Sequence, residues 1–167
     1  MTAHAELRSA RAIDLQEAVA FIWREAELLD VRDYDAWLRL WTPAGRYVIP
    51  IERDVVDHAG ALNIAYDDGP MREARVKRLR SGLSISANAA ARTVRTISRF
   101  VPAREEPGLI ELRCAQHVAE QKREHARLVA ADVTYRLVRV DDARALDLKV
   151  VQLIDSDEAQ HGVGYLL

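Results

Sequence analysis

The chain has 167 residues, which is enough for a single domain with one well-buried core. Hydrophobic residues make up 49% and charged residues 30%, and the formal net charge is −2, so the composition is that of a soluble globular protein without the basic excess of a nucleic-acid-binding domain. No apolar run approaches the ~20 residues of a membrane span, and the N-terminal residues lack the apolar core of a signal peptide, so we expect a cytoplasmic protein.

The residues that bind metals and cofactors are sparse. One cysteine, Cys114, excludes an internal disulfide and an iron–sulfur cluster held by this chain alone, since even a Rieske centre needs two Cys and two His. No two of the five histidines stand three or four residues apart on a predicted helix, and the glycine-rich phosphate-binding motifs are absent. We therefore expect no metal, cofactor or catalytic residue in this chain. The histidines are His4, His58, His117, His125 and His161.

The first predicted element is an amphipathic helix after a loose arm over residues 1–13. Asp14 and Glu17 have the spacing of a capping box, in which each side chain bonds the other's backbone N–H. Apolar residues then recur at the spacing of one helix face. They are Leu15, Ala18, Val19, Ile22, Ala26 and Leu29.

A second helix is predicted from Asp33, a favourable N-cap, and is expected to end at the Pro- and Gly-containing residues 42–45. A strand over residues 46–51 follows, and Pro50 indicates that this strand is at an edge or ends there. The helix carries large side chains at helical spacing, namely Tyr34, Trp37, Leu38 and Trp41. Of these, Trp37 and Trp41 are expected to be core residues or subunit-interface anchors.

Alternating Leu62, Ile64 and Tyr66 predict a short strand over residues 62–66. A third helix over about residues 70–82 is predicted next, with Met71, Ala74 and Leu79 facing inward. Its other faces hold five cations and one acid, Glu73. The cations are Arg72, Arg75, Lys77, Arg78 and Arg80.

From residue 93 the apolar period changes to two, which predicts four long strands joined by short turns in an antiparallel meander. The apolar residues 162–167 are expected to pack back on the sheet. Helices followed by strands are typical of an α+β domain, with N-terminal helices on one face of a curved, mainly antiparallel sheet, and we expect residues 1–167 to form one domain. The predicted strands span residues 93–101, 109–120, 128–140 and 146–154.

Three segments carry a family resemblance: residues 25–54, EAELLDVRDYDAWLRLWTPAGRYVIPIERD; residues 64–82, IAYDDGPMREARVKRLRSG; and residues 91–101, ARTVRTISRFV. Together with LIDSDE near the C-terminus, they resemble the small (beta) subunit of aromatic-ring-hydroxylating dioxygenases, the Rieske non-haem iron oxygenases. The order and spacing of the segments match that family over most of residues 17–167.

The resemblance implies a cone-shaped fold like cystatin and nuclear transport factor 2. It implies a non-catalytic, structural role in a complex with a large (alpha) subunit, commonly three of each, with the beta subunits associating as a trimer. The alpha subunit would carry the Rieske 2Fe-2S cluster and a mononuclear iron, with NADH as the electron source. The complex would add O₂ to an aromatic ring during catabolism of the aromatic compound.

Two other functions stay open from the residues alone. Asp132 interrupts an apolar strand, so it either lies on an exposed sheet face or lies inside the cone. Inside, with Tyr66, His117 or Tyr135 nearby, it could act as the general base of a stand-alone isomerase or dehydratase. A pocketed homo-oligomeric binding protein is the third alternative. Cys114 is expected to be a buried, inert thiol.

The cations of the third helix are the most suggestive surface feature. The chain as a whole is acidic, so these cations are segregated rather than general. We expect part of this helix to meet acids on the sheet or on a partner subunit. The predicted interface residues are Arg72, Arg75, Arg78, Trp37 and Trp41.

Overall fold

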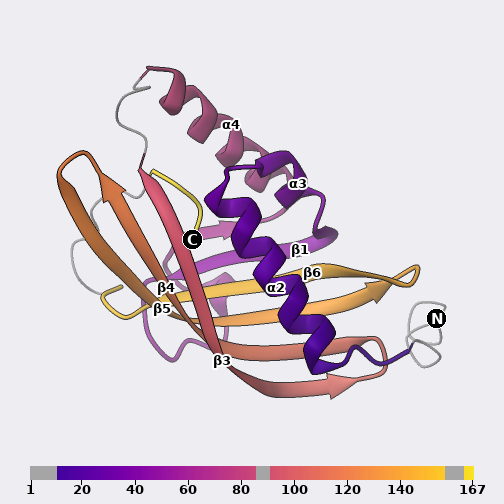
Figure 1. Cartoon of the computed structure of the whole chain (residues 1–167). Helices are drawn as coiled ribbons and strands as arrows, with labels where there is room; N and C mark the ends of the chain where they lie inside the picture. The colour runs from indigo at the N-terminus through magenta and orange to yellow at the C-terminus, as the bar shows by residue number, and fades with distance from the viewer. Residues whose placement is uncertain (1–10, 86–90, 157–163) are drawn as a thin grey trace.

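A six-stranded sheet curls around helix α2 (Leu15–Asp30) in the computed structural model, which describes residues 11–85, 91–156 and 164–167 (Figure 1). The strands are arranged in the order β2-β1-β6-β5-β4-β3, with β1 and β6 parallel and the other neighbours antiparallel. The strands are β1 (Trp41–Pro50), β2 (Asn63–Asp67), β3 (Arg92–Glu106), β4 (Leu109–Lys122), β5 (His125–Val140) and β6 (Ala143–Leu153).

The α+β prediction and the antiparallel meander of the last four strands are confirmed. The alternation that predicted them is also the alternation of burial along most of β4 and along residues 131–137 of β5, because every second residue there faces the core. The opposite face of the β3–β6 sheet is drawn without a covering helix in Figure 1. The buried residues of these two strands include Ile110, Leu112, Cys114, Val118, Val133, Tyr135 and Leu137.

Helix α2 begins as predicted. Glu17 N donates to Asp14 Oδ1 at 2.7 Å and Asp14 N donates to Glu17 Oε2 at 3.2 Å, which completes the capping box. The apolar stripe is buried from Ala18 to Leu29, whereas Leu15 is exposed, so the inward face begins one turn later than predicted. Among the described helices, none is long and apolar enough to cross a membrane.

The second helix is shorter than predicted. Helix α3 spans Tyr34–Leu38, and Trp41 already lies in β1, paired with Leu146 of β6. The predicted turn at residues 42–45 is instead an irregular stretch of β1, where the register against β6 shifts between Trp41 and Arg46. Strand pairing therefore overrides the local helix and turn signals. The edge strand is β2, not β1, and Pro50 marks the end of β1.

Two elements bury charged residues and expose apolar ones, so the inward face predicted for the third helix was wrong. In β2 the buried residues are Ala65 and Asp67, while Ile64 is exposed. In helix α4 (Gly69–Ile85) the inward side chains are Arg72 and Val76, with Leu79 half-buried; Met71 and Ala74 are exposed. The physical reason is the same in both elements: buried ionic and carbonyl partners are available to the charged side chains, so burial there does not follow hydropathy.

The last described residues pack onto the fold, as predicted for the apolar tail. Leu167 N donates to the Tyr47 hydroxyl at 2.9 Å, and the Tyr165 hydroxyl donates to Glu120 Oε2 at 2.7 Å. Leu166 O accepts a bond from Arg95. The tail residues 162–163 and most of the predicted N-terminal arm, residues 1–10, lie outside the described residues.

Candidate functional site

A row of polar side chains crosses the inner face of the sheet. Strand register places Tyr47 of β1, Lys149 of β6 and Tyr135 of β5 side by side. All three side chains are fully or almost fully buried. A lysine at the centre of such a row requires an anionic partner, because an ammonium group out of water is costly unless paired.

The partner of Lys149 is Glu25 of helix α2, which lies above the row. Lys149 Nζ donates to Glu25 Oε1 at 2.7 Å and to Oε2 at 3.0 Å, and both side chains have no exposed surface. Trp37 Nε1 donates to Oε1 at 2.8 Å, and the Tyr135 hydroxyl donates to Oε2 at 3.2 Å. Glu25 is therefore a carboxylate inside the cone, and its two oxygens accept hydrogen bonds from three donors.

Burial sets the protonation behaviour of this cluster. It lowers the pKa of the Lys149 amine, an effect that the adjacent Glu25 carboxylate opposes. It raises the pKa of the Tyr135 phenol well above its ordinary value, and Glu25 adds to that rise. Burial also raises the pKa of the Cys114 thiol to about 12. The cluster thus holds no thiolate nucleophile near neutral pH, and the predicted inert thiol fits these surroundings.

Three aromatic side chains close around the Glu25 pair. Trp37, Trp41 and Tyr47 pack edge to face, with ring centroids 5.4, 5.8 and 6.3 Å apart. The guanidinium of Arg72 stacks on Trp41 at 4.2 Å and donates to Gly45 O at 2.5 Å. Three of the five predicted interface residues, namely the two tryptophans and Arg72, are thus core residues of this chain.

The other cations of α4 face outward or bond within the chain. Arg75 binds both oxygens of the buried Asp67 carboxylate, and Arg80 pairs with Asp35 at 2.8 Å. Arg78 and Lys77 are exposed. The acids that we expected on the sheet for this helix therefore include Asp67, and Arg78 is left as the predicted interface cation that faces solvent.

Asp132 lies on the outer face of the sheet, away from α2. Its side chain is 62% exposed and pairs with Arg99, so the exposed alternative is the one observed. His117 lies on the same outer face of β4, Tyr66 lies on β2 beyond two intervening strands, and Tyr135 faces the interior. The structure therefore does not assemble the general-base site that we considered for an isomerase or dehydratase.

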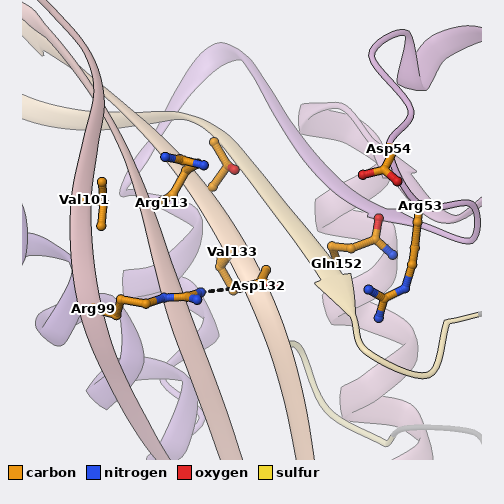
Figure 2. Close-up of a pocket in the computed structure, with 9 residues that line it drawn as sticks. Arg53, Asp54, Arg99, Val101, Arg113, Asp132, Val133 and Gln152 are labelled. Carbon is orange, nitrogen blue, oxygen red and sulfur yellow. Dashed lines mark hydrogen bonds and ion pairs between the residues drawn. The ribbon is translucent and has the colours of Figure 1, made fainter.

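A pocket of about 430 Å³ surrounds the Arg99–Asp132 pair on this outer face (Figure 2). The side chains of β3, β4 and β5 form one wall, and Arg53 and Asp54, which follow β1, form the other. The remaining lining residues are Val101, Arg113, Val133, Thr134 and Gln152.

The sequence interpretation missed the Glu25–Lys149 pair, although a signal was present. Glu25 stands between Ile22 and Leu29 within the apolar stripe of α2, and Lys149 alternates with Val151 on the inner face of β6. A charged residue at an apolar position in each of two elements indicates a buried pair. Nothing in a single sequence shows that the two positions meet.

The described part of the chain does not fit a metal or an iron–sulfur cluster. Within residues 11–85, 91–156 and 164–167, no group of three or more His, Cys, Asp and Glu side chains is placed to hold a metal ion. Cys114, the single cysteine, is buried with its thiol directed to Val133 O at 3.6 Å.

Residues 24–157 match the family model of the ring hydroxylating beta subunit. The chain belongs to this family. The resemblance of the three segments is therefore confirmed. The chain is 35% identical over 108 residues to the small subunit of anthranilate 1,2-dioxygenase from Acinetobacter baylyi, an alignment covering 60% of this chain and 65% of the relative. It is 38% identical over 87 residues to the small subunit of 2-halobenzoate 1,2-dioxygenase from Burkholderia cepacia, covering 49% and 53%.

Solved structures of family members share the whole fold. The beta subunit of benzoate 1,2-dioxygenase from Burkholderia mallei superposes with a TM-score of 0.78, covers 92% of this chain and 98% of its own, and is 21% identical. This likeness confirms the cone-shaped fold. The sequence alignments span less than two thirds of the curated relatives' lengths.

Proposed function

We propose that this chain is the small, non-catalytic subunit of a cytoplasmic, multicomponent dioxygenase that adds O₂ to an aromatic compound. The observation that carries the proposal is the beta-subunit family match over residues 24–157. The interior supports it, because the buried Glu25 carboxylate is held by three donors and is not free to act as a base. The relatives' names make anthranilate and halobenzoates the first substrates to test.

The redox groups of such an enzyme belong on its large subunit in this proposal. The single cysteine cannot hold a Rieske cluster, and the described residues of this chain contain no group of side chains placed to hold a mononuclear iron. The large subunit would hold both groups and receive electrons that originate from NADH. This chain contributes shape and contacts, in an assembly of three large and three small subunits around a trimer of the small ones.

The exposed cations of α4 are the contact surface that we propose for this assembly. Arg75 is bound to Asp67 and orients the helix, and Arg78 is free to meet an acidic surface of another subunit. The buried Arg72, Trp37 and Trp41 would act indirectly, by fixing α4 and α3 to β1.

Co-expression with the large subunit tests the function. The partner to co-express is a large subunit with a Cys-x-His … Cys-x-x-His motif, and an open reading frame adjacent to that of this chain is the first place to look for it. We expect a stable complex by native mass spectrometry, ring dihydroxylation only when both subunits are present, and no turnover of aromatic acids or enolisable ketones by this chain alone. Ketone turnover by the isolated chain would overturn the proposal.

A charge reversal tests the contact surface separately. Arg78→Glu should weaken co-purification of the large subunit, whereas Arg104→Glu should not. Arg104 is exposed near the C-terminal end of β3, and its one ion-pair partner among the described residues is Glu106 at 2.6 Å. Both variants should keep the wild-type circular dichroism spectrum. If Arg78→Glu retains the large subunit as well as Arg104→Glu does, the proposed interface is wrong. The proposed subunit function would not be affected by that result.

A further inference from the structure

We propose that the outer-face pocket between β3, β5 and the segment after β1 is a carboxylate-binding site. Its volume of about 430 Å³ lies in the range of about 300–1,000 Å³ that is usual for small-molecule pockets. Its position on the outer face separates it from the Glu25 cluster, and the function proposed above does not use it.

The floor of the pocket follows from the strand register. Val101, Arg113 and Thr134 form one row across β3, β4 and β5. Asp132 and Gln152 form part of the next row. These side chains point away from α2, because their sequence neighbours on β4 and β5 face the core. These side chains form a polar floor on the outer face of the sheet, and Val101 is the apolar residue at its edge.

A β-bulge brings Arg99 into the pocket. The register of β3 shifts between Ser98 and Val101, and Arg99 has a positive φ of 57°. Simple alternation would direct Arg99 toward the core, beside the inward Ile97. The bulge instead turns its side chain outward, where it crosses β4 above the small Ala115 and meets Asp132 on β5. Figure 2 shows Arg99 reaching Asp132 across the strand.

The opposite wall is fixed by backbone contacts. The Arg53 guanidinium donates to Ile154 O at the end of β6, which ties the segment after β1 to the sheet. Asp54 follows with a φ of 62°, so its backbone is in the left-handed region, as it is at Arg99 and at four non-glycine residues outside the pocket.

The charges favour an anion. Three guanidinium groups, of Arg53, Arg99 and Arg113, face two carboxylates, of Asp54 and Asp132. Arg113 has no hydrogen-bond or ion-pair partner among the described residues, so its planar fork of donors is open. A planar carboxylate matches that fork with two parallel bonds, and the aliphatic side chain of Val101 suits an apolar group beside it. The site therefore fits an organic carboxylate, either free or on an acidic side chain of another subunit.

Titration of the isolated chain with sodium benzoate, followed by amide chemical shifts, tests the free form. We expect saturable shifts at residues 99–101, 113 and 132–134, with affinity roughly tenfold lower in Arg113→Met, as for loss of a charge-assisted bond. Arg104→Met, which removes an exposed guanidinium outside the pocket, should bind as the wild type does. Because Arg113 contacts no described partner, Arg113→Met should fold normally.

Assembly with the large subunit tests whether an acidic side chain of another subunit supplies the carboxylate. In that case benzoate gives no response, and Arg113→Met weakens the complex whereas Arg104→Met does not. This pair of results would support the site. A benzoate response that Arg113→Met leaves unchanged would overturn the site. So would the absence of both a benzoate response and an assembly defect. Neither result touches the proposed dioxygenase function, which co-expression tests independently.

Discussion

Replacing Lys149 by Met should be among the most damaging single changes in the core. The substitution keeps most of the side-chain volume but removes the cation that holds both oxygens of Glu25. Trp37 and Tyr135 would still donate one bond each. The carboxylate would then carry an unbalanced charge at a site with no exposed surface.

The structure sets the magnitude of this effect. Removing one member of a fully buried ion pair costs about 3–5 kcal/mol, because the remaining charge keeps its desolvation penalty without its counterion. For a domain of this size each kcal/mol lowers the melting temperature by about 2–4 °C, so a fall on the order of 6–20 °C is expected. The double variant Glu25→Gln/Lys149→Met should recover at least half of that loss, since it leaves no buried charge.

Urea unfolding followed by circular dichroism measures the stability of the wild type, Lys149→Met and the double variant. Leu112→Met, a change of similar size next to Tyr135 on the inner face of β4, is the matched control for altered packing. A loss of less than about 1 kcal/mol in Lys149→Met, or a double variant less stable than the single one, would refute the reasoning that charge imbalance dominates this site.

Three further predictions concern other positions. Cys114, with its pKa raised by burial to about 12, should resist alkylation by iodoacetamide at pH 8 in the folded chain and react once the chain is unfolded in urea. Gly45→Ala should lower the urea midpoint, because the new Cβ would lie 2.9 Å from the Trp41 ring and 3.0 Å from Leu146 O, whereas Gly164→Ala, which meets no atom within 4 Å, should not. Arg72→Met should cost roughly 2 kcal/mol in urea unfolding through lost carbonyl bonds and stacking, and a neutral result would show that Arg72 does not fix α4 to β1.

The sheet strands were predictable because their two faces differ consistently in polarity. Alternation coincides with burial along most of β4 and along residues 131–137 of β5, and turn residues mark the ends of both strands. Helix α2 was predictable for the same kind of reason, through its capping box and apolar stripe. Each of these signals is contained within one element and needs no knowledge of its neighbours.

Prediction failed where a distant partner decides the local structure. Pairing with β6 makes Trp41 a strand residue, although its spacing from Trp37 is helical. Carbonyl groups of β1 and the Trp41 ring allow α4 to bury Arg72 and to expose Met71. The bulge that turns Arg99 outward leaves no mark in the residue pattern around it. In each case the deciding contact comes from another element of the chain.

The Glu25–Lys149 pair is also decided by a distant contact, and it bears on the proposed role of the chain. Its members lie 124 residues apart, on α2 and on β6, and their bonds tie the central helix to the middle of the sheet. A general base must keep a lone pair available to its substrate, but the Glu25 carboxylate accepts from an amine, an indole and a phenol at once. Releasing the Glu25 carboxylate from these donors would lower the free energy of unfolding, as we expect for Lys149→Met. An interior arranged in this way favours a fixed shape over chemistry, and a fixed shape is what a subunit that supports a catalytic partner requires.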